Sequence, residues 1–113
     1  MRISMPRGDI KLVRFIINDP SGNISDTDFT EIYFTVKKST KVSEYEFQKK
    51  LSTGGIVKLG DGDYQIKIEP EDTGRMTYGD YKFDIQICYE REIKDTFVGI
   101  FILTEEVTFN DNE

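Results

Sequence analysis

The sequence predicts an all-β protein built as an antiparallel sandwich. Segments rich in β-branched and aromatic residues, with apolar and polar positions alternating, recur along the chain. Clusters of Gly, Pro, Asn and Asp separate these segments at intervals that suit short antiparallel strands. No long amphipathic helical pattern interrupts the series, so we expect about seven to eight strands.

Three segments give the clearest strand patterns. Residues 11–17 form the first, and a dense group of turn-forming residues follows them. Residues 31–37 and 81–89 alternate cleanly, and the second of these has the longest period-two pattern in the chain. Each of these strands should turn one face to a core, which for residues 31–37 means Ile32, Phe34 and Val36.

The remaining strands are predicted from shorter patterns. Residues 56–59 and 64–68 should form a hairpin around a Gly-Asp-Gly-Asp turn. A turn at Arg91-Glu92 should lead into a strand within residues 94–103, and a last strand is expected at about residues 105–109. Residues 38–52 fit a strand in part and a helical turn in part, so both remain open there.

The segment between the hairpin and the long strand has features of a sandwich crossover. Pro70 and its acidic neighbours predict a single helical turn that Gly79 ends. Tyr81 then occupies the position of a tyrosine corner, in which the hydroxyl bonds back to the crossover backbone. Phe83 stands where an antibody domain has a cysteine. We therefore expect an immunoglobulin-like sandwich.

One domain is expected over residues 1–113. Its ends, residues 1–8 and 110–113, should be flexible. The chain has 8 Phe and 6 Tyr, which predicts a largely aromatic core.

The composition argues against catalysis. The chain has no His, which excludes Ser-His and Cys-His nucleophile pairs, and its one Cys cannot form a usual zinc site. Paired carboxylates could hydrolyse a glycoside, and the candidates on composition alone are Asp61, Asp63, Glu71, Asp72 and Asp84. However, Asp61 and Asp63 flank the glycine of a turn, where Asp is favoured for local hydrogen bonding. Cys88 is expected to be a passive, half-buried thiol. We therefore predict no enzymatic activity, cofactor or metal.

The charge and hydropathy argue against two kinds of partner. There are 21 acidic and 15 basic residues, and this net charge of −6 repels a nucleic-acid backbone. No segment approaches the roughly 20 apolar residues needed to cross a bilayer. Neither nucleic acid nor a membrane is an expected partner, and a reduced cytoplasm suits the single cysteine.

One segment resembles a known family. Residues 72–85 are similar to the signature Asp-Thr, hydrophobic, Gly-x-Tyr-x-Tyr/Phe-Asp-Ile of phage tail and baseplate proteins, including the N-terminal domain of the baseplate upper protein. Other segments agree in order, among them Arg7-Gly8-Asp9, Asp19-Pro20-Ser21-Gly22, Asp95-Thr96-Phe97-Val98-Gly99 and Glu106-Val107-Thr108. The residues of this signature, expected to be structural, are Asp72, Thr73, Gly79, Tyr81, Phe83, Asp84 and Gly99.

The resemblance implies a non-enzymatic virion protein without a cofactor. Such a protein is assembled in the bacterial cytoplasm, contacts other virion proteins and is usually an oligomer. The baseplate protein continues into further domains, so a small tail, baseplate or neck accessory protein of a phage or prophage fits this length better. The alternative is a carbohydrate-binding or cell-surface adhesion module, in which Tyr33, Tyr45 or Tyr78 would stack on sugar rings.

Overall fold

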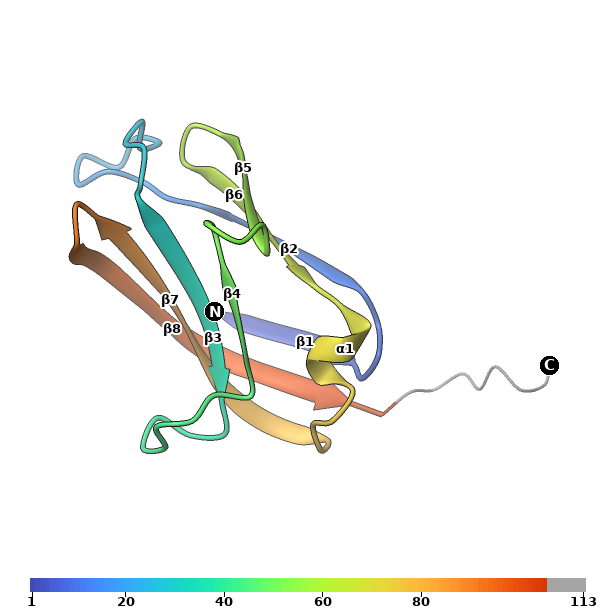
Figure 1. Cartoon of the computed structure of the whole chain (residues 1–113). Coiled ribbons are helices and arrows are strands. Elements are labelled where there is room, and N and C mark those ends of the chain that lie inside the picture. Colours follow the sequence, from blue (N-terminus) through green and yellow to red (C-terminus); the bar gives the residue numbers. More distant parts are fainter. Residues whose placement is uncertain (106–113) are drawn as a thin grey trace.

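Eight strands and one helical turn make up residues 1–105, the part of the chain that the computed structural model describes; of Lys94 only the backbone is described (Figure 1). The strands are β1 (Arg2–Pro6), β2 (Lys11–Ile16), β3 (Glu31–Lys37), β4 (Phe47–Lys50), β5 (Ile56–Gly60), β6 (Asp63–Ile68), β7 (Gly79–Tyr89) and β8 (Glu92–Thr104), and α1 is Pro70–Thr73. The all-β class is thus confirmed. Apart from Glu105, the strand expected at residues 105–109 lies outside the described residues.

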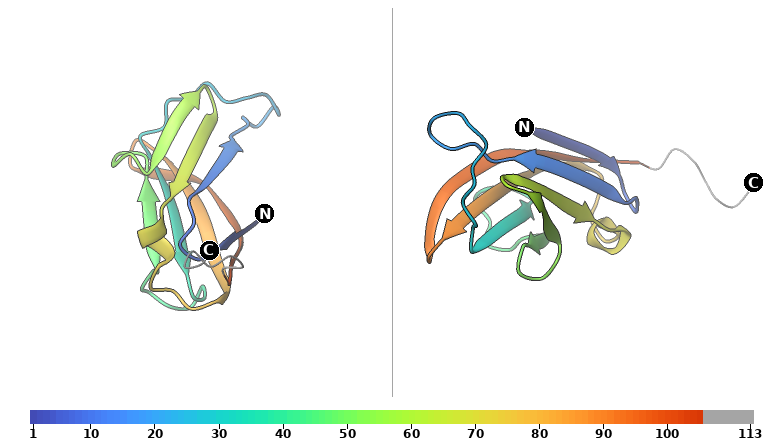
Figure 2. Two further views of the ribbon diagram at one scale, coloured as in Figure 1. Left: turned by 90° about the vertical axis from the view of Figure 1, so that its right-hand side faces the viewer. Right: turned by 90° about the horizontal axis from the view of Figure 1, so that it is seen from above.

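The strands form two sheets. The larger sheet has the strand order β1-β8-β7-β3-β4, and the smaller sheet has the order β2-β6-β5. The smaller sheet covers one face of the larger sheet, as both views of Figure 2 show. All pairs are antiparallel except β1 and β8, in which Arg2 lies opposite Ile100. The expected purely antiparallel arrangement is therefore wrong for this one pair. Because β1 and β8 are joined through the rest of the fold and not by a tight turn, nothing forces them to run antiparallel.

Alternation along the strands decides which residues form the core. On β3, Ile32, Phe34 and Val36 are fully buried, as predicted. The larger sheet also curls. Two strands, β7 and β3, separate β4 from β8, yet the ring centroids of Phe47 on β4 and Phe101 on β8 lie only 5.9 Å apart. Aromatic rings thus join opposite sides of a single sheet, and the smaller sheet closes over them.

The N-terminal residues are not the flexible lead-in that the sequence predicts. They form β1, in which Ile3 and Met5 are buried in the core while Arg2 and Ser4 face outward. A strand this short, ending at a proline, differs little in sequence from a frayed end, and it is stabilised by its pairing with β8. The flexible end predicted at residues 110–113 lies outside the described residues.

Residues 38–52 contain no helix. They form an exposed loop and then the short β4, which pairs with β3 and turns Phe47 inward. The turn after β7 also lies one residue earlier than expected, at Glu90 and Arg91, where φ is 51° and 72°. Two positive φ values suit a two-residue hairpin of type I′, a turn whose usual residues, Asn and Gly, are absent here.

The helical turn α1 forms where the sequence predicts it, and a capping box stabilises its start. Glu69 is the N-cap, and its backbone N–H donates to the Asp72 carboxylate at 2.7 Å. The turn ends at Gly74, so Gly79 does not end it. Gly79 instead opens β7 with φ of 135°, a conformation that side chains with a Cβ disfavour.

Gly99 is required by the packing of β7 against β8. It lies opposite Phe83, whose ring covers it. A Cβ at residue 99 would lie 2.6 Å from Cζ of Phe83 and 2.5 Å from the Met1 carbonyl oxygen. Both contacts are too close, and one of them is to backbone that cannot rotate away.

The Gly99→Ala variant should therefore be less stable than the wild type by about 1–3 kcal/mol in free energy of unfolding, as expected for an overpacked core. Urea denaturation followed by circular dichroism measures this difference. Gly60→Ala is the matched control, since no atom lies within 4 Å of its added Cβ, and it should change stability little. Equal stability of both variants would contradict the proposed role of Gly99.

Candidate protein-binding interface

Several signature residues lie around the crossover that contains α1. The hydroxyl oxygen of Thr73 accepts a hydrogen bond from the Gly8 backbone N–H at 2.9 Å. The Asp72 carboxylate forms an ion pair with Lys49 of β4 at 2.6 Å, and both side chains are largely buried. These contacts join the β6–β7 crossover to the β1–β2 connection and to the edge of the larger sheet. Their role is structural.

Tyr81 makes the hydrogen bond that the sequence predicts for it. Its side chain is buried, and its hydroxyl donates to the Thr77 carbonyl at 2.7 Å. Phe83, two residues on, is buried against Phe34 with ring centroids 5.3 Å apart. Tyr64 contrasts with Tyr81, because its hydroxyl is fully buried but has no hydrogen-bond partner among the described residues.

The two tyrosines should respond differently to loss of the hydroxyl. Tyr81→Phe breaks a buried hydrogen bond and should lower the free energy of unfolding by about 1 kcal/mol. Tyr64→Phe removes a buried polar atom that has no such bond, so it should be neutral or stabilising. Chemical denaturation of both variants measures the difference, and a larger loss for Tyr64→Phe would contradict the assignment.

The remaining carboxylates considered for catalysis also have structural surroundings. Asp63 accepts two parallel hydrogen bonds from the Arg14 guanidinium, and these lower the pKa of its carboxyl. Asp61 lies 3.8 Å from the Lys58 ammonium. Within residues 1–105, no group of three or more Asp, Glu, Cys or His side chains is placed to hold a metal ion.

Asp84 lies on the outer face of β7, away from Tyr81 and Phe83. It is half-buried, between Thr35 of β3 and Val98 of β8 in the strand register. Burial raises the pKa of its carboxyl, and the charge of Lys37 opposes this rise. The folded protein therefore binds this proton more tightly than the unfolded chain does.

This shift predicts a pH-dependent effect of Asp84→Asn. The neutral carboxyl favours the folded state below its ordinary pKa of 3.8, and this advantage is lost as the pH rises through the raised pKa. At about pH 7 the asparagine variant should therefore unfold at higher urea concentration than the wild type, and at about pH 3 the difference should vanish. Asp80→Asn, at an exposed position of the same strand, is the control. A gain that persists at low pH would contradict this account.

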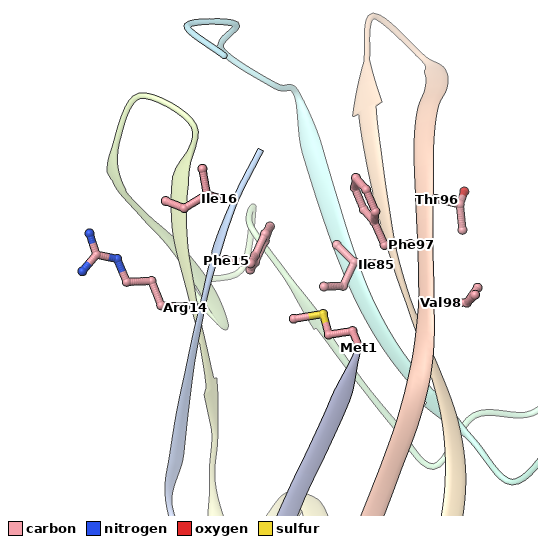
Figure 3. A pocket seen from close by; sticks show the side chains of 8 residues that line it. All are labelled: Met1, Arg14, Phe15, Ile16, Ile85, Thr96, Phe97 and Val98. Carbon is pink, nitrogen blue, oxygen red and sulfur yellow. The ribbon is translucent and has the colours of Figure 1, made fainter. Parts of the chain in front are cut away.

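An apolar opening lies between the two sheets, along β2 and β8 (Figure 3). We call it the edge groove; its volume is about 540 Å³ and it is lined by Met1, Arg14, Phe15, Ile16, Ile85, Thr96, Phe97 and Val98. In Figure 3 the side chains of Met1, Phe15, Ile85 and Phe97 converge, whereas Arg14 points away to one side and Thr96 and Val98 to the other.

Two sheet edges flank the edge groove. β2 is an edge strand of the smaller sheet. β8 pairs with β1 only from Ile100 onward, so no strand within residues 1–105 pairs with this side of β8 at residues 96–99. An open strand edge presents backbone donors and acceptors to an incoming strand. The groove therefore combines apolar walls with unpaired backbone.

Many of the exposed apolar side chains belong to the strands that border the groove or lie just before them. Of the 14 large hydrophobic residues that are exposed, eight belong to β1, β2 and β8 or to the residues just before β1 and β2, namely Met1, Ile10, Leu12, Ile16, Ile93, Phe97, Val98 and Ile100. The alternation of β2 predicts that some of these residues face outward, but the sequence does not reveal that β2 and β8 would border one groove.

The tyrosines considered for sugar stacking do not form a common platform. The ring of Tyr78 is covered by the Arg7 guanidinium, 4.6 Å from its centroid, and Lys50 lies 5.7 Å from that of Tyr33. Tyr45 is exposed in the loop before β4. Cys88 is free and half-buried, as predicted.

No helix within residues 1–105 is long and apolar enough to cross a membrane. Comparison of the chain with models of protein families, with curated proteins and with solved structures finds no match.

Proposed function

We propose that this chain is a non-enzymatic structural protein of a bacteriophage or prophage particle, an accessory component of the tail, baseplate or neck. In this proposal it acts by binding neighbouring virion proteins through the edge groove. The observation that carries the binding role is the apolar groove flanked by two sheet edges. The assignment to a phage particle rests on the resemblance of residues 72–85 to tail and baseplate proteins.

We also propose that the fold is immunoglobulin-like. The sheet order β2-β6-β5 matches strands B-E-D of the variable-type immunoglobulin sandwich, and β8-β7-β3-β4 matches G-F-C-C′. Tyr81 bonds to the backbone four residues upstream near the start of the F equivalent, which is the place of the tyrosine corner. β1 precedes the B equivalent in sequence, as strand A does, and lies parallel to β8 at the edge of the larger sheet.

Strand edges support a role in assembly over a role in sugar binding. A partner segment that adds to an open edge gains affinity from backbone hydrogen bonds and specificity from side-chain pockets. Proteins whose edge strands bind no partner usually cover those strands with another segment or place charged side chains on them. Here the groove side carries Phe97, 40% exposed, and Val98, 69% exposed. The described tyrosines lack a comparable arrangement for stacking on a sugar.

Mass spectrometry of purified particles tests the proposed function. Particles from a strain that carries this gene should contain the chain in fixed proportion to their tail proteins. Replacing Phe97 with Asp should lower its amount in particles at least tenfold, because a buried charge in an apolar contact is strongly unfavourable. Val57→Asp, at an equally exposed apolar position on the opposite edge of the smaller sheet, should not.

Complete, tailed particles that lack the chain, with all of it left in the lysate supernatant, would overturn the assignment. Equal loss of both variants from particles would show that the edge groove is not the contact surface.

A further inference from the structure

We propose that the edge groove binds residues 105–109 of a second copy of this chain, so that neighbouring copies join by strand exchange. This inference rests on the proposed function, since it names the partner that the groove accepts. Four features of the chain support it: an unfinished core, an open backbone edge, the chemistry of residues 105–109 and the distance those residues can span.

The core is unfinished at the edge groove. Phe97 lies opposite Ile85 in the β7–β8 ladder and points to the same side as that core residue (Figure 3). Ile85 is 1% exposed, but Phe97 is 40% exposed. β1 begins at Arg2, which lies opposite Ile100, and no residue of β1 pairs with β8 at Phe97. An apolar side chain from outside would complete the packing around Phe15, Ile85 and Phe97.

The backbone of β8 is open beside this gap. The Ile100 N–H donates to the Met1 carbonyl at 3.1 Å, and this bond begins the β1–β8 ladder. By the alternation of a strand, the N–H and C=O of Val98 point to the same side as those of Ile100. The Thr96 N–H is bonded to the Asp95 carboxylate at 2.9 Å, which limits the ladder at its upper end. A short strand in line with β1 therefore fits this edge.

The sequence of residues 105–109 complements the groove. In Glu105-Glu106-Val107-Thr108-Phe109, Val107 and Phe109 would share one face of an extended segment, and two carboxylates precede them. One basic residue, Arg14, is among the residues that line the groove. Its side chain pairs with Asp63 and is 63% exposed, at the margin of the groove. The two apolar side chains would therefore meet apolar walls, and the complementarity is mainly apolar.

Distance requires the segment to come from another copy. The last residue of β8, Thr104, lies seven positions from Phe97, about 23 Å along the strand. Val107 and Phe109 follow Thr104 by three and five residues, so a fully extended chain carries them back only about 10 and 17 Å. β1 also occupies the edge of β8 that such a return path would follow. A chain cannot fill its own groove with these residues.

The resulting contact is heterologous, because the donated segment and the accepting groove are different surfaces. Each copy can donate to one neighbour and accept from another. Repetition of such a contact forms a ring when its rotation closes, or a helical filament when it does not. Both are forms in which a small protein can encircle or line a particle.

Light scattering of the full-length chain over a concentration series tests this inference. The wild type should associate as its concentration rises, and Phe109→Asp and Phe97→Asp should each raise the apparent dissociation constant at least tenfold. Val57→Asp should leave it unchanged and serves as the matched control. A wild type that is monomeric at all concentrations, or an association that resists both aspartate substitutions, would overturn the inference.

Disulfide trapping identifies which segment enters the groove. In a Cys88→Ser background, chains with Phe97→Cys are mixed with chains with Phe109→Cys and oxidised. The mixed dimer should exceed either homodimer, and substituting Val57→Cys for Phe97→Cys should abolish this excess. No excess of the mixed dimer, together with unchanged association of Phe109→Asp, would overturn the inference independently of folding defects in one variant.

The particle experiment separates this inference from the proposed function. Suppose that the chain is present in particles and that Phe97→Asp removes it, while Phe109→Asp weakens neither self-association in solution nor incorporation into particles. A different virion protein then fills the groove. The proposed function would stand and the strand exchange would be wrong. If the chain is absent from particles but strand exchange is observed in solution, the strand exchange would stand and the proposed function would be wrong.

Discussion

The joint around α1 is the constraint on which the rest of the structure depends. Two connections between the sheets, one before β2 and one after β6, lie next to each other. The hydroxyl oxygen of Thr73, in the second connection, accepts a hydrogen bond from the backbone N–H of Gly8, in the first. Asp72 serves two purposes, since its carboxylate caps the helical turn and pairs with Lys49. Tyr81 then fixes the start of β7. A largely buried ion pair and three hydrogen bonds therefore act together at this joint.

The two sheets are joined at α1, but the edge groove between β2 and β8 stays open. β1 seals the β2–β8 side only as far as Ile100, and beyond it the walls diverge around the edge groove. Phe97 therefore has the orientation of a core residue but the exposure of a surface residue. A protein that worked alone would gain stability by covering this ring, since each square ångström of apolar surface removed from water contributes about 25 cal/mol. The open groove favours a protein completed by a partner.

The sequence predicted the strands whose pattern is local. Residues 31–37 and 81–89 alternate strictly, so their buried faces follow from period alone. Tyr81 could be placed because its role depends on residues only four positions away. β1 was missed because a five-residue strand is stabilised by pairing with residues about a hundred positions later. The edge groove was missed for the same reason, since β2 and β8 are far apart in sequence.

The sequence by itself determined the β class, the inward faces of the long strands and the structural roles of Tyr81 and the helical turn, because each depends on neighbouring residues. Only the tertiary structure decided that β1 runs parallel to β8, that the larger sheet curls until Phe47 meets Phe101, and that Gly99 must lack a side chain beneath Phe83. These features depend on which strands lie side by side and which lie at an edge. Pairing of that kind is set by the packing of the whole chain, and alternation within one strand carries no record of it.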